Sequence, residues 1–420
     1  MRVATGSPSR RGPAPWWRRL AGALRADLSS AGQSIVGLAI NSSTSLVAGL
    51  ILGSMQGTFA VFPGLLVMVP AAIGLRGNVF SALGSRISTS IHAGDYRASL
   101  RLGSVMGDNA GASLMLTAVT SLALAVIAAA VSVVFGVDGQ VSVLSLVTIS
   151  IVGGLLASAV VLVITLALVA VAVRQEWDLD DLVAPVVSTF GDVVTVPALW
   201  LATFLVGTAV WATLEALVLA ALALAVGALG WWSAHGRIRR IMRESVPVLL
   251  VAGTLSALAG LVLEKQMATF EAFGALLVLA PAFVSSAGAL GGLLASSLAS
   301  GLHLGTIDPT PRPSGAVWRE VRILALAAVP VFVFNGAGAN FVSMLHGDTS
   351  PGLGLMVAAA LLGAVGAVAF VVVIAYYGSI VAVRFGVDPD TYGIPTVTSS
   401  VDFVGAVALI LAVSALGITR

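Results

Sequence analysis

The chain has 420 residues, of which 58% are hydrophobic and only 10% are charged, with a formal net charge of +2 and a mean hydropathy of +1.04. This composition lies far outside the range of soluble globular domains, so the chain is a membrane protein solvated by lipid. It has no cysteine, which excludes disulfides and thiolate metal sites, and its four histidines make it a poor candidate for a zinc or haem protein.

The first 33 residues are polar and rich in arginine, and we expect them to form a cytosolic tail. They lack the apolar core of a secretory signal peptide. The segment "WWRRLAGALRADL" at 16–28 has the aromatic, basic and leucine residues typical of a helix that lies in the membrane interface. A plain disordered tail is the alternative.

Eleven apolar runs follow, each bounded by charged or turn residues and long enough to cross a bilayer. They occupy residues 34–56, 59–83, 104–135, 141–173, 185–206, 209–232, 246–263, 271–298, 322–345, 352–383 and 394–418. The fourth and tenth are longer than a straight crossing requires, so we expect them to be tilted or to project beyond the lipid. The predicted fold is an all-α membrane protein.

The arginines orient these spans. The tail and the predicted loops at 84–103, 233–245 and 299–321 carry arginines and fall on one side, whereas alternate loops such as "FGVDGQ" carry almost no positive charge. The positive-inside rule then predicts a multi-pass protein of the plasma membrane with a cytosolic N-terminus and an extracytoplasmic C-terminus.

The sequence contains an internal repeat. "VAVRQEWDLDDLVAPVVSTFGD" at 171–192 matches "VAVRFGVDPDTYGIPTVTSSVD" at 381–402 with a shift of 210 residues. "VPAAIGLRGNVFSALGSRISTSIHAG" from 69 matches "APAFVSSAGALGGLLASSLASGLHLG" from 280 with a shift of 211. Two separate blocks at one spacing, half the chain length, indicate a tandem duplication.

The duplication predicts the domain organisation: a membrane repeat at 34–206, a linker helix with a basic loop at 207–245, and a second repeat at 246–420. Each repeat has five spans, an odd number, so direct fusion would invert the second copy. The linker helix restores the orientation, which gives two parallel repeats in a 5+1+5 arrangement, an internal pseudo-dimer.

Two matched aspartates are the candidate cation site. Asp192 and Asp402 occupy equivalent positions within predicted spans, where a carboxylate is costly unless it faces a partner or a water-filled path. Pro185 and Pro395 fit the first turn of their helices. Counting from Pro185, Asp192 lies about 10 Å along its helix, close to the depth of about 9 Å that we expect for Asn78 below the end of its span.

Carboxylates with nearby amide and hydroxyl oxygens suit Mg²⁺ that keeps part of its water shell. Prolines inside spans free a backbone carbonyl that can face a path, and glycines let helices approach closely. Both are also common in membrane helices for packing alone. The predicted path residues beside the two acids are Asn78, Thr189, Ser399, Pro70, Gly77, Pro281 and Gly288.

A second group of acids precedes the two aspartates. It consists of Asp178, Asp180, Asp181, Asp388 and Asp390. These residues form either a solvated loop or an acidic cytosolic vestibule that concentrates cations. Glu215, in the linker helix, is expected to be structural.

The segment from 69 resembles the MgtE-type magnesium transporters, in particular the solute-carrier branch in which two such membrane domains are fused. The resemblance rests on Pro70-Ala71, on Gly74-Leu75-Arg76-Gly77-Asn78 and on Ser85-Arg86-Ile87-Ser88-Thr89. "DDLVAPVVSTFGD" is similar to the family's Asp, Pro, then Gly-Asp pattern, whose final acid, here Asp192, lines the ion path. The second repeat departs from the pattern at Ala289, Ser297 and Val401, which implies an asymmetric site. The regulatory domains of many MgtE channels have no counterpart here.

The predicted function is divalent-cation transport at the interface of the two repeats, with Mg²⁺ first and Mn²⁺, Co²⁺ or Ca²⁺ as alternatives. A Na⁺- or H⁺-coupled exchanger using the same acids, or a non-transporting membrane scaffold, remains open. No group of His, Cys or Ser with a nearby base lies at a membrane face, so we expect no enzyme. The expected partners are divalent cations and the lipid bilayer, and we expect no nucleic-acid partner.

Overall fold

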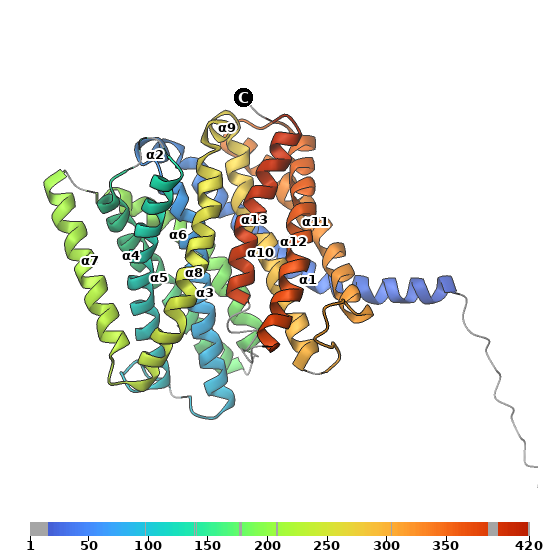
Figure 1. Ribbon diagram of the computed structural model, residues 1–420, viewed down its shortest axis with the longest axis horizontal. Coiled ribbons are helices and arrows are strands. Elements are labelled where there is room, and N and C mark those ends of the chain that lie inside the picture. Colours follow the sequence, from blue (N-terminus) through green and yellow to red (C-terminus); the bar gives the residue numbers. More distant parts are fainter. Residues whose placement is uncertain are drawn as a thin grey trace, which may run out of the picture.

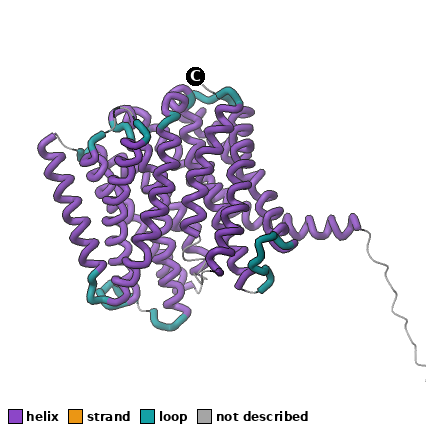
Figure 2. The backbone as a smooth tube through the Cα atoms, viewed as in Figure 1, coloured by secondary structure: helices purple, strands orange, loops and turns teal. Residues whose placement is uncertain are grey.

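The computed structural model describes residues 16–96, 98–137, 139, 141–175, 179–206, 209–303, 305–384 and 394–418. These residues form helices and short connections and include no strand (Figure 2). The helices are α1 (Trp16–Ser54), α2 (Gln56–Val61), α3 (Leu65–His92), α4 (Val105–Val134), α5 (Val143–Gln175), α6 (Leu179–Thr203), α7 (Ala209–Trp231), α8 (Gly236–Glu264), α9 (Met267–Ala272), α10 (Gly274–His303), α11 (Gly315–His346), α12 (Leu353–Arg384) and α13 (Ile394–Ala415).

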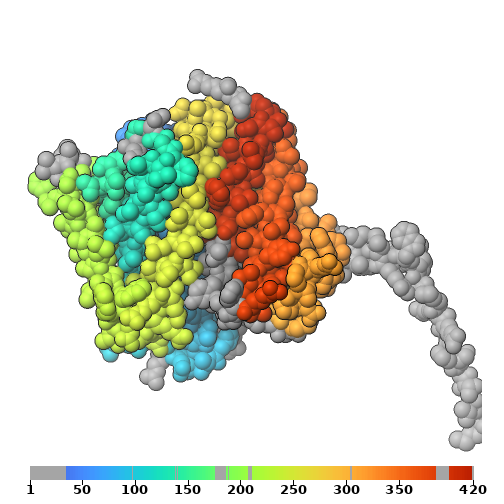
Figure 3. Space-filling model, viewed as in Figure 1, coloured from blue at the N-terminus to red at the C-terminus, as the bar shows by residue number. Residues whose placement is uncertain are grey.

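The helices of the described chain fall into two matching series joined by α7. α1 to α6 correspond in order to α8 to α13 and are similar in length, except that α1 has 39 residues and α8 has 29. The short α2 and α9 lie at the same end of the bundle (Figure 1). α3 and α10 both run from that end to the opposite end of the bundle. At this opposite end α7 also ends and turns into α8. Equivalent helices therefore run parallel, as the sequence repeat predicts. α7 stands at the edge of the bundle (Figures 1 and 3).

The two series are interlocked through their first helices. α1 packs against α10 and α11 of the second series, whereas α8 packs against α3 and α4 of the first. On the face in Figure 3, α8 lies between α4 and α13. Glycines make these crossings close: a Cβ at Gly49 would clash with the carbonyl oxygen of Val278, and one at Gly260 with that of Val67. Such small residues allow membrane helices to pack without a hydrophobic driving force between them.

Ten of the described helices are long and apolar enough to cross a membrane. They correspond to ten of the eleven predicted spans, and the remaining one is α6, whose apolar part is the shorter Thr189–Thr203. The all-α membrane class is confirmed, and the structure agrees with ten to eleven spans.

Several predicted boundaries were wrong on the arginine-bearing side. The predicted loop at 84–103 begins inside α3, which continues to His92, because Ile87 and Ser88 are buried and Arg86 donates a 2.8 Å hydrogen bond to Asn109 of α4. The predicted loop at 233–245 is mostly the first turns of α8, where Arg237 pairs with Asp108 at 3.0 Å. The loop at 299–321 is likewise shortened by α10 and α11. Polar residues thus continue the helices beyond the apolar stretch.

Candidate cation site

Asp192 lies on α6, where three helices meet. Its Oδ2 accepts a hydrogen bond of 2.8 Å from the Ser45 hydroxyl on α1 and one of 3.1 Å from the Ser285 hydroxyl on α10. Only 6% of the residue's surface is exposed. The carboxylate is therefore held between the first and second series, with two donors that favour its charged form.

Asp402 lies on α13 in a related setting. Its Oδ2 accepts a 2.8 Å hydrogen bond from the Ser256 hydroxyl on α8. A Cβ at Gly74 of α3 would lie 3.7 Å from this same oxygen, and a Cβ at Gly288 of α10 would lie 3.4 Å from Oδ1. Both carboxylate oxygens therefore face glycine backbone, which leaves room beside them that a larger side chain would fill.

The two environments are related by the sequence repeat. Ser45 and Ser256 are 211 residues apart and each donates to the aspartate of its own series. Gly74 beside Asp402 and Ser285 beside Asp192 are also 211 residues apart, on α3 and α10. Asp192 of the first series thus contacts α10, and Asp402 of the second series lies beside the equivalent position of α3. Such an exchange is expected around a pseudo-twofold axis.

The two acids approach one face of α10. Ser285, which binds Asp192, and Gly288, which faces Asp402, are three residues apart and so lie on one side of the helix about 4.5 Å apart along its axis. The acids are therefore neighbours at the boundary of the two series.

Small and polar residues continue from this point along both helices. On each helix a line of partly or fully exposed positions runs past the acids, between neighbours that are mostly buried. The line consists of Pro70, Gly74, Asn78, Ser81 and Ser85 on α3 and of Pro281, Ser285, Ala289, Gly292 and Ser296 on α10. The positions correspond one to one with a shift of 211, although several side chains differ. Both helices therefore present a similar accessible surface that passes the acids and continues toward the arginine-bearing end.

The polar surroundings are richer on the Asp192 side. The Asn41 amide donates to Ser285 at 3.0 Å, and the hydroxyls of Ser42 and Ser286 share a 2.9 Å hydrogen bond. The repeat places Ala252 at the position of Asn41 and Gly253 at that of Ser42. The residues around the aspartate-binding serines therefore differ between the two series. This asymmetry adds to the differences at Ala289, Ser297 and Val401.

The predicted path residues are distributed as follows. Gly77 and Gly288 lie beside the aspartate-bearing helices: the Gly77 nitrogen is 3.8 Å from a Cβ at Gly191, and Gly288 faces Asp402. Asn78 and Thr189 are half-buried, and Ser399 is buried. Pro70 and Pro281 lie inside α3 and α10, as predicted.

The predicted depths were wrong, although the relative placement is retained. α6 begins at Leu179, six residues before Pro185, so Pro185 is not in its first turn. The start "LDD" puts two acids at the positive end of the helix dipole, which favours the earlier start. α3 ends at His92, so Asn78 lies in the middle of that helix. The contact between Gly77 and Gly191 nevertheless puts Asn78 and Asp192 at similar depth.

The predicted acidic vestibule falls largely outside the described residues. Asp178, Asp388 and Asp390 belong to undescribed segments. Asp180 and Asp181 lie in the first turn of α6 rather than in a loop, but the description does not extend to their side chains. The vestibule remains a prediction.

The sequence analysis missed the two serines that hold the aspartates. "SLVAG" at 45–49 matches "SALAG" at 256–260 with the same shift of 211. This third block contains both the aspartate-binding serines and the glycines of the close helix crossings. Comparing the first spans of the two repeats would have identified these residues.

The donor set suits a cation that keeps much of its water. Within the described residues, no group of three or more His, Cys, Asp or Glu side chains could enclose a metal ion. Two carboxylates surrounded by hydroxyls and glycine backbone can bind a divalent cation by charge and through its water, as Mg²⁺ commonly binds. A soft metal would find no sulfur or imidazole ligand there.

Comparison with known families agrees with this geometry. The model of the MgtE family, described as a divalent cation transporter, matches residues 69–202 and again residues 280–412. The chain belongs to the MgtE family. The two matches start 211 residues apart, so they confirm the internal repeat, and each extends from the second long helix of a series through its aspartate-bearing helix.

The MgtE chain also has similar curated relatives. It is 23% identical over 390 residues to Solute carrier family 41 member 2 of Gallus gallus, covering 87% of this chain and 66% of that protein. It is 22% identical over 408 residues to the Homo sapiens member 2, with the same coverage, and 23% identical over 326 residues to member 3 of Rattus norvegicus, covering 75% and 68%. The chain thus spans about two thirds of the length of these relatives. No solved structure matches it.

Proposed function

We propose that this MgtE family member carries divalent cations, Mg²⁺ first, across the membrane along a path between α3 and α10 that is centred on Asp192 and Asp402. The observation that supports this most is the approach of both carboxylates to one face of α10, at Ser285 and Gly288. Two neighbouring carboxylates among membrane-spanning helices, one buried and one half-buried, repel each other unless a cation lies between or beside them.

The proposal assigns a role to each group. The carboxylates supply two negative charges that match one divalent cation. The hydroxyls of Ser45, Ser285 and Ser256 fix the carboxylates without supplying further charge. Ca²⁺ takes six to eight oxygen ligands, more than these residues supply, so the donor set favours Mg²⁺ with bound water. We place the arginine-bearing end in the cytosol of a plasma membrane, following the positive-inside rule.

Ion flux into liposomes tests the proposal. Asp192→Asn and Asp402→Asn together remove the charge with little change in size, and we expect Mg²⁺ uptake to fall at least about tenfold while the thermal unfolding temperature is retained. Glu215→Gln on α7 removes an acid from a span outside the two series and should leave uptake unchanged. Full uptake by the double aspartate variant would overturn the proposal. Uptake that requires an opposing Na⁺ or H⁺ gradient would assign the same acids to a coupled exchanger.

A further inference from the structure

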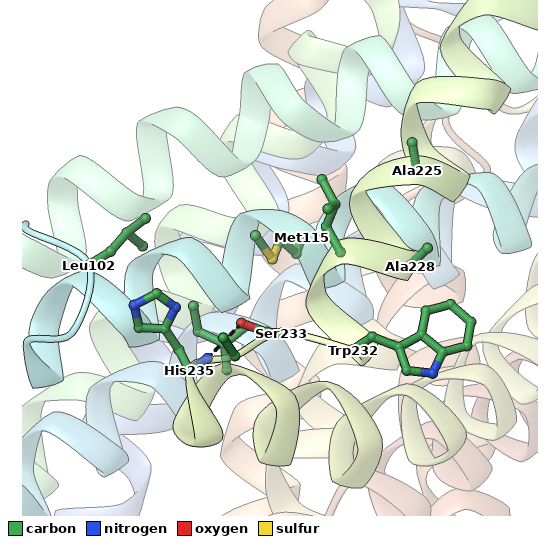
Figure 4. A pocket seen from close by; sticks show the side chains of 10 residues that line it. Leu102, Met115, Ala225, Ala228, Trp232, Ser233 and His235 are labelled. Carbon is green, nitrogen blue, oxygen red and sulfur yellow. Dashed lines mark hydrogen bonds between the residues drawn. The ribbon is translucent and has the colours of Figure 1, made fainter.

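A groove lies at the arginine-bearing end of the bundle, away from the two aspartates. It has a volume of about 720 Å³ and lies between α7, the start of α4 and the turn into α8. Figure 4 shows Leu102 and Met115 on one side and Ala225 and Ala228 of α7 on the other. This volume is within the usual range of sites for small molecules.

The lining of this α4–α7–α8 groove is almost entirely apolar. Of the ten lining residues, only Ser233 and His235 are polar, and the Ser233 hydroxyl already accepts a hydrogen bond from the His235 backbone at 3.1 Å. Leu102 is 63% exposed and Trp232 is 71% exposed at the end of the groove. A tryptophan at the end of a span is typical of the membrane–water interface. The groove therefore suits a hydrocarbon chain that enters from the lipid.

Positive charge surrounds the same end of the groove. Arg101 precedes the lining residue Leu102, and Arg237 and Arg239 flank the lining residue Ile238; all three are exposed. Arg237 pairs with Asp108, but Arg101 and Arg239 form no ion pair with the described residues. A phosphate group at the interface would lie among these guanidinium groups while its acyl chain occupied the groove.

We propose that the α4–α7–α8 groove binds one anionic phospholipid from the leaflet on the arginine-bearing side. The acyl chain lies against Met115, Ala225 and Ala228, and Arg101 and Arg239 attract the headgroup. A second copy of the chain fits less well, because a twofold contact through this surface would bring two arginine clusters together. This proposal concerns lipid binding alone and does not depend on transport.

Photolabelling of the full-length chain tests it. The protein is reconstituted in phosphatidylcholine vesicles that contain a small fraction of phosphatidylglycerol with a diazirine in its acyl chain, and adducts are located by mass spectrometry. We expect them on the peptides that contain Met115, Ala225 and Ala228, with labelling several-fold stronger than from the matching phosphatidylcholine probe. Equal labelling by the two probes, adducts spread over the outer face of α7, or crosslinks between copies would each overturn the proposal.

Two sets of variants test the apolar groove and the arginines separately. Ala228→Trp fills the groove and should reduce labelling by both probes; Ala225→Trp provides a second filling variant if the first fails to fold. Arg101→Gln with Arg239→Gln should reduce only the preference for phosphatidylglycerol. Arg384→Gln, an exposed arginine at the end of α12, is the matched control and should change neither. An unchanged preference in the double arginine variant would overturn the headgroup assignment.

Discussion

The hydroxyl of Ser45 donates to the carboxylate of Asp192 over 2.8 Å, although 147 residues separate them in the chain. Ser256 and Asp402 repeat this relationship at the same distance in the second series. The two pairs connect the first helix of each series to its last. They hold both acids at the boundary between the series, and they differ in one respect: Asp192 has a second hydroxyl donor, Ser285.

This difference predicts unequal effects of removing the two serines. A hydrogen bond to a charged group contributes about 1.5–3 kcal/mol. Ser256→Ala removes the only side-chain donor among the described contacts of Asp402, so we expect it to raise the apparent KM for Mg²⁺ uptake about tenfold or more. Ser45→Ala leaves Ser285 in place and should have a smaller effect. Ser256→Thr retains the hydroxyl and is the control, and a larger effect from Ser45→Ala would contradict this account.

The glycine beside Asp402 supports a second prediction. Gly288→Ala adds a methyl group 3.4 Å from Asp402 Oδ1, where it would displace water or a cation, so we expect uptake to fall about tenfold without loss of stability. Gly291→Ala, one turn further along α10, adds a methyl group at the same 3.4 Å distance from Val397 and Val401 side chains. It is therefore the matched control. Equal uptake by the two variants would show that the space beside Oδ1 is not used.

The close helix crossings support a third prediction, this time about stability. Gly49→Ala forces a Cβ into the Val278 backbone, and Gly260→Ala does the same at Val67, so each should destabilise the fold by about 1–3 kcal/mol, the usual cost of overpacking. Gly37→Ala, on α1, meets nothing within 4 Å and should not. Thermal unfolding in detergent measures all three. If Gly37→Ala proved as destabilising as Gly49→Ala, helix propensity or lipid contact rather than the crossing would be responsible.

Much of this architecture could be predicted from the chain because the repeat is visible in it. Matching Asp192 to Asp402 required only a constant shift between two segments, and span number followed from apolar length. Helix ends were harder, because α3 and α8 continue through polar residues that are held by contacts such as Arg86 with Asn109 and Arg237 with Asp108. Such contacts join residues far apart in sequence.

The partner of each helix was the least predictable feature. An apolar pattern indicates that a helix is buried, but it does not indicate which helix covers it. Ser45 is one of several small residues in a serine-rich stretch, and nothing local distinguishes it from Ser42 or Ser43. The repeat of Ser45 as Ser256 marks the position, but its partner Asp192 follows only from the packing of α1 beside α6 and α10.

The packing of α1 and of α8 against helices of the opposite series has a consequence for biosynthesis. The ribosome produces α1 more than 200 residues before its neighbours α10 and α11. During that interval α1 must wait in the bilayer, or beside an insertion factor, with the surface around Gly49 uncovered. The first series cannot reach its final packing until α8 arrives to cover α3 and α4. The first series therefore completes its packing late in synthesis, and a chain truncated after α7 would leave α1 without α10 and α11 and α3 without α8.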